Sequence, residues 1–228
     1  MSWLQDRFSL NTLGIKEPMG QTSDRMRPEN PTEWTKKNLR NSMRSRLRET
    51  PDELLQTWSG EVVAELQSRQ DLWSKQGVVA LFGGLRSEPN LISTLLPWLQ
   101  AQGWRTALFT VSNTELLPVI VQNDSDLIRG HLGVWEPLGN DSLPLRELDV
   151  ILVPGLAFDA STGARMGRGG GFYDRLLSQQ EIRAKLVGVT FQLQVISDIP
   201  TEPHDIHLPE IVTEKGTQRV VPITGISA

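Results

Sequence analysis

The chain has 228 residues, enough for one sizeable hydrophobic core, and its net charge of −4 argues against a general nucleic-acid-binding protein. The absence of cysteine excludes disulfide bonds and thiolate metal sites, and no apolar run reaches the roughly 18–20 residues of a membrane span. The first residues also lack the apolar core of a signal peptide. We therefore expect a cytoplasmic, monomeric protein with neither a nucleic-acid nor a membrane partner.

Residues 1–33 contain Pro18, Pro28 and Pro31 among scattered polar residues, and they show no sustained hydrophobic period. A segment of this kind cannot bury enough apolar surface to form a packed element. We therefore expect a poorly structured N-terminal tail at 1–33 and one domain over residues 34–228.

Residues 36–48, KKNLRNSMRSRLR, predict a helix with an apolar and a cationic stripe, each repeating every four residues. The stripes are Leu39, Met43 and Leu47, and Lys36, Arg40, Arg44 and Arg48. A solvated basic face is the ordinary interpretation of such a pattern. Here, however, six cations occur without an acid four residues on, and their repulsion favours an anionic partner over the stripe.

The following segments alternate between helix and strand patterns. Thr50 and Glu53 have the spacing of a capping box, and an amphipathic helix follows them to about residue 69. Short apolar runs typical of buried strands occur at 77–84, 105–111, 148–153 and 184–192, with helical patterns at 90–103 and 172–178. This alternation predicts a single α/β domain with a mainly parallel sheet.

Residues 163–177, GARMGRGGGFYDRLL, place five glycines around Arg165 and Arg168 at the start of a helical pattern. The strand at 148–153 leads this segment to the carboxyl edge of the sheet, where open α/β folds bind ligands. Glycine N–H groups at a helix start, together with arginines, suit phosphate. The segment is neither a Walker A loop nor a dinucleotide fingerprint. From these residues alone, phosphate binding and a structural glycine turn are equally favoured.

Three long motifs, in this order, resemble the 5-formyltetrahydrofolate cyclo-ligase family, also called 5,10-methenyltetrahydrofolate synthetases. They are VPGLAFD at 153–159, the glycine-rich segment at 163–177, and VGVTFQLQVISDIPTEPHDIHLPEIVTE at 187–214. The helix at 36–48, Glu88 and GVWEP at 133–137 match further landmarks, so the resemblance covers about residues 36–214. It implies a three-layer, Rossmann-like, doubly wound domain with a glycine-rich ATP loop at the carboxyl edge of the sheet.

The resemblance implies an enzyme that uses ATP and Mg²⁺ to close 5-formyltetrahydrofolate, with or without a polyglutamate tail, into 5,10-methenyltetrahydrofolate. A formamide oxygen is a poor leaving group, so ATP first phosphorylates it and ADP is formed. N10 then attacks the activated carbon, and phosphate departs. Such catalysis depends on positioning and charge neutralisation. Two alternatives stay open: a diverged paralogue acting on another formamide or a thiamine-related compound, and a non-catalytic folate- or nucleotide-binding protein.

The same resemblance implies roles for individual residues. The expected ATP contacts are Lys36, Arg40, Arg165, Met166, Gly167, Arg168, Gly169, Gly170, Gly171, Phe172 and Tyr173. The expected folate contacts are Glu88, Arg168, Gly169, Gly170, Gly171 and Phe172. Arg165, Arg168 and Tyr173 are the candidate catalytic residues, and Asp174 and Asp205 the candidate magnesium ligands. His204 is expected to support the magnesium or phosphate region. Taken singly, each acid also fits an ordinary helix start, turn or solvated loop.

Overall fold

The computed structural model describes residues 35–130, 133–202 and 205–220. Its helices are α1 (Lys36–Glu49), α2 (Asp52–Ser68), α3 (Gln70–Trp73), α4 (Leu95–Ala101) and α5 (Phe172–Leu177). Its strands are β1 (Val78–Leu81), β2 (Arg105–Ser112), β3 (Glu115–Val121), β4 (Leu127–Arg129), β5 (Trp135–Pro137), β6 (Val150–Val153), β7 (Ala157–Phe158), β8 (Arg165–Met166), β9 (Lys185–Val189), β10 (Glu210–Thr213) and β11 (Gly216–Arg219). The predicted tail at 1–33 lies outside the described residues and stays a prediction.

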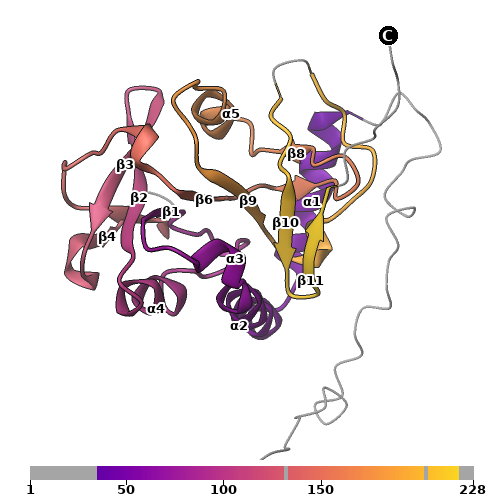
Figure 1. The fold of residues 1–228 in the computed structure, drawn as a ribbon. Coiled ribbons are helices and arrows are strands. Elements are labelled where there is room, and N and C mark those ends of the chain that lie inside the picture. Colours follow the sequence, from indigo (N-terminus) through magenta and orange to yellow (C-terminus); the bar gives the residue numbers. More distant parts are fainter. Residues whose placement is uncertain (1–34, 131–132, 203–204, 221–228) are drawn as a thin grey trace, which may run out of the picture.

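Seven strands form the main sheet, in the order β11-β10-β9-β6-β1-β2-β3 (Figure 1). The inner neighbours pair in parallel, whereas β3 and β11 add an antiparallel strand at each edge. The prediction of an α/β domain with a mainly parallel sheet is confirmed. No strand was predicted over β3, which contains Pro118, a residue that a strand accommodates where its absent N–H is not needed for a ladder bond.

Helices cover both faces of this sheet, with α2 and α4 on one side and α5 on the other (Figure 1). Side chains of β1 alternate between two buried clusters, Val79 and Leu81 packing in the cluster with α2 and α4. Val78 and Ala80 pack in the other cluster, which includes α5. All four residues of β1 are buried, as expected for a parallel strand covered on both faces.

The N-terminal helix was predicted closely, but the start of the next helix was not. α1 buries Leu39, Met43 and Leu47, the predicted apolar stripe. The capping box at Thr50 is wrong, because Pro51 occupies the N-cap position of α2 without a side-chain cap. The Thr50 hydroxyl instead donates to the Arg46 carbonyl oxygen at 2.8 Å and closes the preceding helix.

The order of the strands determines where a ligand can bind. From β1 the chain runs to β2 on one side, and it later returns to place β6 on the other side of β1. The loops that follow β1 and β6 therefore diverge at the carboxyl edge, which is where open α/β sheets form their binding crevice. Among the described residues, no helix has both the length and the apolar character to cross a membrane.

Candidate active site

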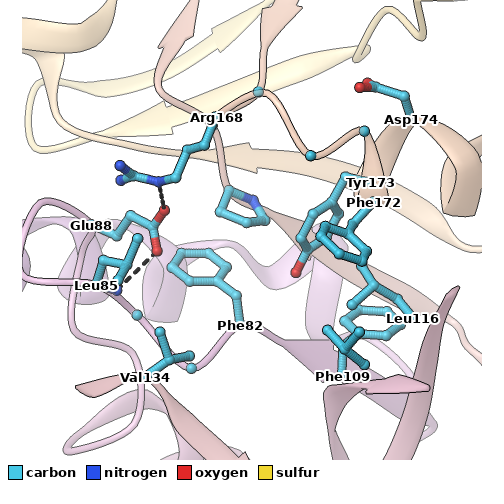
Figure 2. Close-up of a pocket in the computed structure, with 18 of the residues that line it drawn as sticks. Phe82, Leu85, Glu88, Phe109, Leu116, Val134, Arg168, Phe172, Tyr173 and Asp174 are labelled. Carbon is cyan, nitrogen blue, oxygen red and sulfur yellow. Dashed lines mark hydrogen bonds and ion pairs between the residues drawn. The ribbon is translucent and has the colours of Figure 1, made fainter. Parts of the chain in front are cut away.

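A pocket of about 340 Å³ lies at the carboxyl ends of β1 and β6. Its wall combines residues 82–85 after β1, Pro154 and Gly155 after β6, and much of the glycine-rich segment (Figure 2). The remaining wall is largely apolar and includes Phe109 and Leu116 from β2 and β3. A pocket thus lies at the sheet edge where the sequence predicts the binding site, and it brings together segments up to about ninety residues apart in sequence.

One ion pair crosses this pocket and joins two residues that the sequence singled out. The Arg168 Nε donates to Glu88 Oε1 at 2.9 Å, and the Arg168 Nη2 donates to the Ser87 hydroxyl at 2.9 Å (Figure 2). The other Glu88 oxygen accepts the backbone N–H of Leu85 at 3.0 Å. The side chain of Glu88 is only 9% exposed, so its charge is neutralised within the wall by a partner from the glycine-rich segment.

Arg165 holds the floor of the same pocket from β8. Its side chain is 3% exposed, and the guanidinium forms an ion pair with Asp174 and donates to the Pro154 carbonyl oxygen at 3.2 Å. Among the residues that the structure describes, its buried Nε has no hydrogen-bond partner. The great majority of buried N–H groups in proteins have a hydrogen-bond partner. This Nε therefore marks a position where an additional acceptor would be favourable.

Tyr173 places its hydroxyl oxygen in the pocket, facing Phe82 (Figure 2). Its ring packs edge-on against Phe109 with the centroids 5.8 Å apart, and the Arg165 guanidinium lies 5.8 Å from the Tyr173 ring centroid. Burial, reinforced by the negative charge of Glu88, raises the pKa of Tyr173 well above its ordinary value. The hydroxyl therefore stays protonated at neutral pH and is available as a hydrogen-bond donor.

The cationic stripe of α1 contacts the chain itself. Lys36 Nζ lies 2.6 Å from an Asp205 carboxylate oxygen, while the Arg40 Nε donates to the Gly167 carbonyl oxygen at 3.1 Å. One turn further, the Arg44 Nη2 donates to the Arg168 carbonyl oxygen at 2.9 Å. The inference from unpaired charge was incomplete, because it considered only acids within the helix. Acceptors distant in sequence satisfy three of the four cations.

The two acids expected to bind magnesium are engaged by different cations, Asp174 by Arg165 and Asp205 by Lys36. Asp205 also accepts the backbone N–H of Glu202 at 2.7 Å. No group of three or more acidic or histidine residues forms a metal site within residues 35–130, 133–202 and 205–220. Magnesium needs only one or two protein carboxylates, so the assignment stays a prediction. The expected role of His204 lies outside the described residues.

The sequence model of the 5-formyltetrahydrofolate cyclo-ligase family matches residues 32–214. The chain belongs to this family. The 5-formyltetrahydrofolate cyclo-ligase of Haemophilus influenzae is 36% identical over 135 residues, covering 58% of this chain and 71% of the relative. That of Mycolicibacterium smegmatis is 38% identical over 137 residues, covering 57% and 69%. The 5,10-methenyltetrahydrofolate synthetase of Aquifex aeolicus superposes with a TM-score of 0.71 at 27% identity, covering 85% of this chain and 96% of that one. The Mycoplasma pneumoniae synthetase, at 18% identity and a TM-score of 0.65, shares the fold over 78% of this chain and 98% of that one.

The glycine-rich segment of this family member changes character along its length. Arg165 and Met166 are buried in β8, whereas Gly169 and Gly170 are exposed. Gly169 has a φ of +112° and Gly171 a φ of +67°, a region that non-glycine residues adopt only at a cost. The segment thus presents exposed backbone next to Arg168, as a loop that contacts phosphate would require.

Several pocket residues were missed by sequence reasoning. Phe82, Phe109 and Val134 line the pocket together with Glu136, and Ser87 holds Arg168. The first two belong to predicted strand segments, and their position at a strand's carboxyl end was an available signal. Val134 precedes β5 and Glu136 is its central residue, and the place of this three-residue strand beside Gly83, just after β1, follows from tertiary packing.

Proposed function

We propose that the protein catalyses the ATP-dependent cyclisation of 5-formyltetrahydrofolate to 5,10-methenyltetrahydrofolate, releasing ADP and phosphate. The observation that carries this proposal is the pocket at the sheet edge. There an aromatic wall lies directly beside the Arg168–Glu88 pair and the exposed glycine backbone. The names of the relatives, cyclo-ligases and methenyltetrahydrofolate synthetases, point to the same reaction.

The residues present fit a bound nucleotide. The glycine-rich segment offers exposed backbone at Gly169 and Gly170, and Arg40 reaches its outer side from α1. Lys36, one turn earlier on the same helix, lies against Asp205. The buried Nε of Arg165, for which the described part of the chain supplies no acceptor, adds a further donor. We assign these residues, with the rest of residues 165–173, to ATP.

The residues also fit Mg²⁺ in chemical type. Asp174, paired with Arg165, and Asp205, paired with Lys36, supply hard oxygen donors. Water and phosphate oxygens complete the usual coordination of this ion. When bound, ATP and Mg²⁺ supply a phosphoryl group that turns the formyl oxygen into a leaving group.

The chain's own side chains position the reactants and neutralise charge. Arg168, half-exposed and held between Glu88 and Ser87, is placed to stabilise negative charge on a transferring phosphate. Tyr173 keeps its proton and donates from the pocket wall toward a carbonyl or formyl oxygen. Phe82, Phe109 and Phe172 supply aromatic surface for the pterin and reduce the access of water. On its composition we place the enzyme in the cytoplasm.

The direct test mixes the purified full chain with 5-formyltetrahydrofolate, ATP and Mg²⁺ and follows the absorbance of methenyltetrahydrofolate. We expect product only when all three are present, with one ADP released per product. ATP hydrolysis without methenyltetrahydrofolate would favour a paralogue acting on another formamide. Folate binding without turnover of either substrate would favour a non-catalytic binding protein.

A further inference from the structure

Glu136 differs from the other two acids of the pocket in having no partner among the residues that the structure describes. The other two acids in the wall are neutralised, Glu88 by Arg168 and Asp174 by Arg165. The side chain of Glu136 makes no hydrogen bond or ion pair within the described ranges 35–130, 133–202 and 205–220. It is half-buried, in a pocket whose remaining surface is largely apolar. A carboxylate partly removed from water without donors is unfavourable, so this position calls for donors from a ligand.

The backbone defines where this carboxylate lies. Glu136 and Val134 occupy alternate positions about β5 and both line the pocket, so both lie on its face of the β4–β5 ladder. Gly130 directly follows β4, the partner strand of β5. A Cβ atom at Gly130 would fall 2.2 Å from the Glu136 carboxyl carbon and from one of its oxygens. The carboxylate therefore rests over the Gly130 backbone, and the glycine leaves the room it occupies.

We propose that Glu136 contacts the substrate, accepting hydrogen bonds from the N–H donors on the 2-amino-pyrimidine edge of the reduced pterin. This inference rests on the proposed function. An amino-pyrimidinone presents adjacent N–H donors, much as a guanidinium does, and a carboxylate accepts such a pair strongly. Both oxygens of Glu88 already accept, one from Arg168 and one from Leu85. In this arrangement Glu88 orients Arg168, and Glu136 recognises the pterin ring of the substrate.

The test is a thermodynamic cycle that combines one change in the protein with one change in the substrate. It compares wild type and Glu136→Gln on 5-formyltetrahydrofolate and on its 2-desamino-2-methyl analogue, which lacks the 2-amino donor. Hydrogen bonds to charged groups lead us to expect a KM for the natural substrate raised about 10- to 100-fold in the variant. The KM for ATP should be unchanged. Because the two changes remove the same contact, loss of the amino group should cost the variant far less than it costs wild type. Equal losses in the two proteins would overturn the proposal.

Two further variants separate a direct contact from a folding effect. Gly130→Ala keeps the carboxylate but displaces it, so it should raise the folate KM in the same direction while thermal unfolding stays close to wild type. Glu115→Gln changes an exposed glutamate at the start of β3 and should leave every constant unchanged. An unaltered folate KM in Gly130→Ala would count against Glu136. Absence of turnover in wild type would instead overturn the proposed function.

Discussion

The two ends of the glycine-rich segment use glycine for different reasons. A Cβ at Gly163 would fall 2.2 Å from the Leu208 carbonyl oxygen, and the Gly163 carbonyl oxygen accepts the Leu208 N–H at 2.8 Å. A Cβ at Gly169 would meet nothing within 4 Å. Both residues have positive φ, +76° and +112°. Gly163 is therefore required by packing, whereas Gly169 borders open space beside the pocket.

This difference gives each of the two interpretations that the sequence left equally favoured its own part of the segment. The part around Gly163 and β8 behaves as a structural turn, packed against the core and holding Arg165. The part from Gly167 to Gly171 is held from outside by Arg40 and Arg44 and leaves its backbone exposed. One glycine-rich segment thus contains both a turn that the fold requires and a candidate binding loop. Substitutions in the first part should affect stability, and substitutions in the second part should affect activity.

The largest expected effect on activity concerns Arg168, which lies in the exposed part of the segment between Gly167 and Gly171. Arg168→Ala should lower turnover about 10²- to 10³-fold, the loss typical of removing one donor to a developing negative charge. The free energy of unfolding should also fall, because Glu88 is only 9% exposed and loses the cation that neutralises it, so rates are compared at a temperature where both proteins are folded. The measurements are initial rates of methenyltetrahydrofolate formation and a thermal unfolding curve.

The matched control is Arg48→Ala, which removes the last cation of the α1 stripe, an exposed side chain outside the pocket lining. Its turnover should equal that of wild type. Near-normal turnover in Arg168→Ala would remove this residue from the catalytic set.

The next effect tests the comparison directly. Gly163→Ala should destabilise the fold by about 2–3 kcal/mol, because the strained φ is joined by a clash with backbone that cannot move aside. Gly169→Ala meets no atom and should cost only about 1 kcal/mol for its φ. Chemical denaturation measures both. Equal destabilisation by the two substitutions would mean that the two ends of the segment do not differ as described.

A smaller effect is expected at the outer edge of the loop. Asp205→Asn should raise the Mg²⁺ concentration for half-maximal rate at least about tenfold, the scale seen when metal sites lose a supporting group. Lys36→Ala removes the partner of Asp205 and should raise the KM for ATP while leaving the KM for folate close to wild type. Titrations of Mg²⁺ and ATP against rate decide between them. A Mg²⁺ midpoint unchanged in Asp205→Asn would make Asp205 a turn residue.

The smallest expected effect is on the pH dependence of folding stability through Tyr173, which can be followed without interference from other tyrosines. Tyr173 is the only tyrosine in the chain, so tyrosinate absorbance reports this residue alone. Burial raises its pKa, so the folded protein keeps a proton that the unfolded chain releases near pH 10. Folding stability should therefore fall as pH rises above about 10, toward the folded pKa. We expect tyrosinate to appear only together with alkaline unfolding. A separate, earlier tyrosinate transition would show that the hydroxyl is not buried as described.

Much of the architecture was predictable because its signals are local. The apolar stripe of α1, the buried run of β1 and the order of strands and helices follow from periodicities that each segment carries by itself. The glycine-rich segment and its flanking motifs likewise identified the family and the edge of the sheet. Local reasoning failed at Thr50, where the hydroxyl closes the preceding helix instead of opening the next.

The sequence by itself determined the fold class, the family and the chemical types in the candidate site. Only the tertiary structure decided which groups meet: Arg168 with Glu88, Lys36 with Asp205, and the α1 arginines with the loop carbonyls. It also left Glu136, at the pocket wall, without a partner from the described residues. The physical reason is range. Periodicity and caps act within a few residues, whereas an ion pair between residues 80 or more apart depends on how the strands are ordered in the sheet.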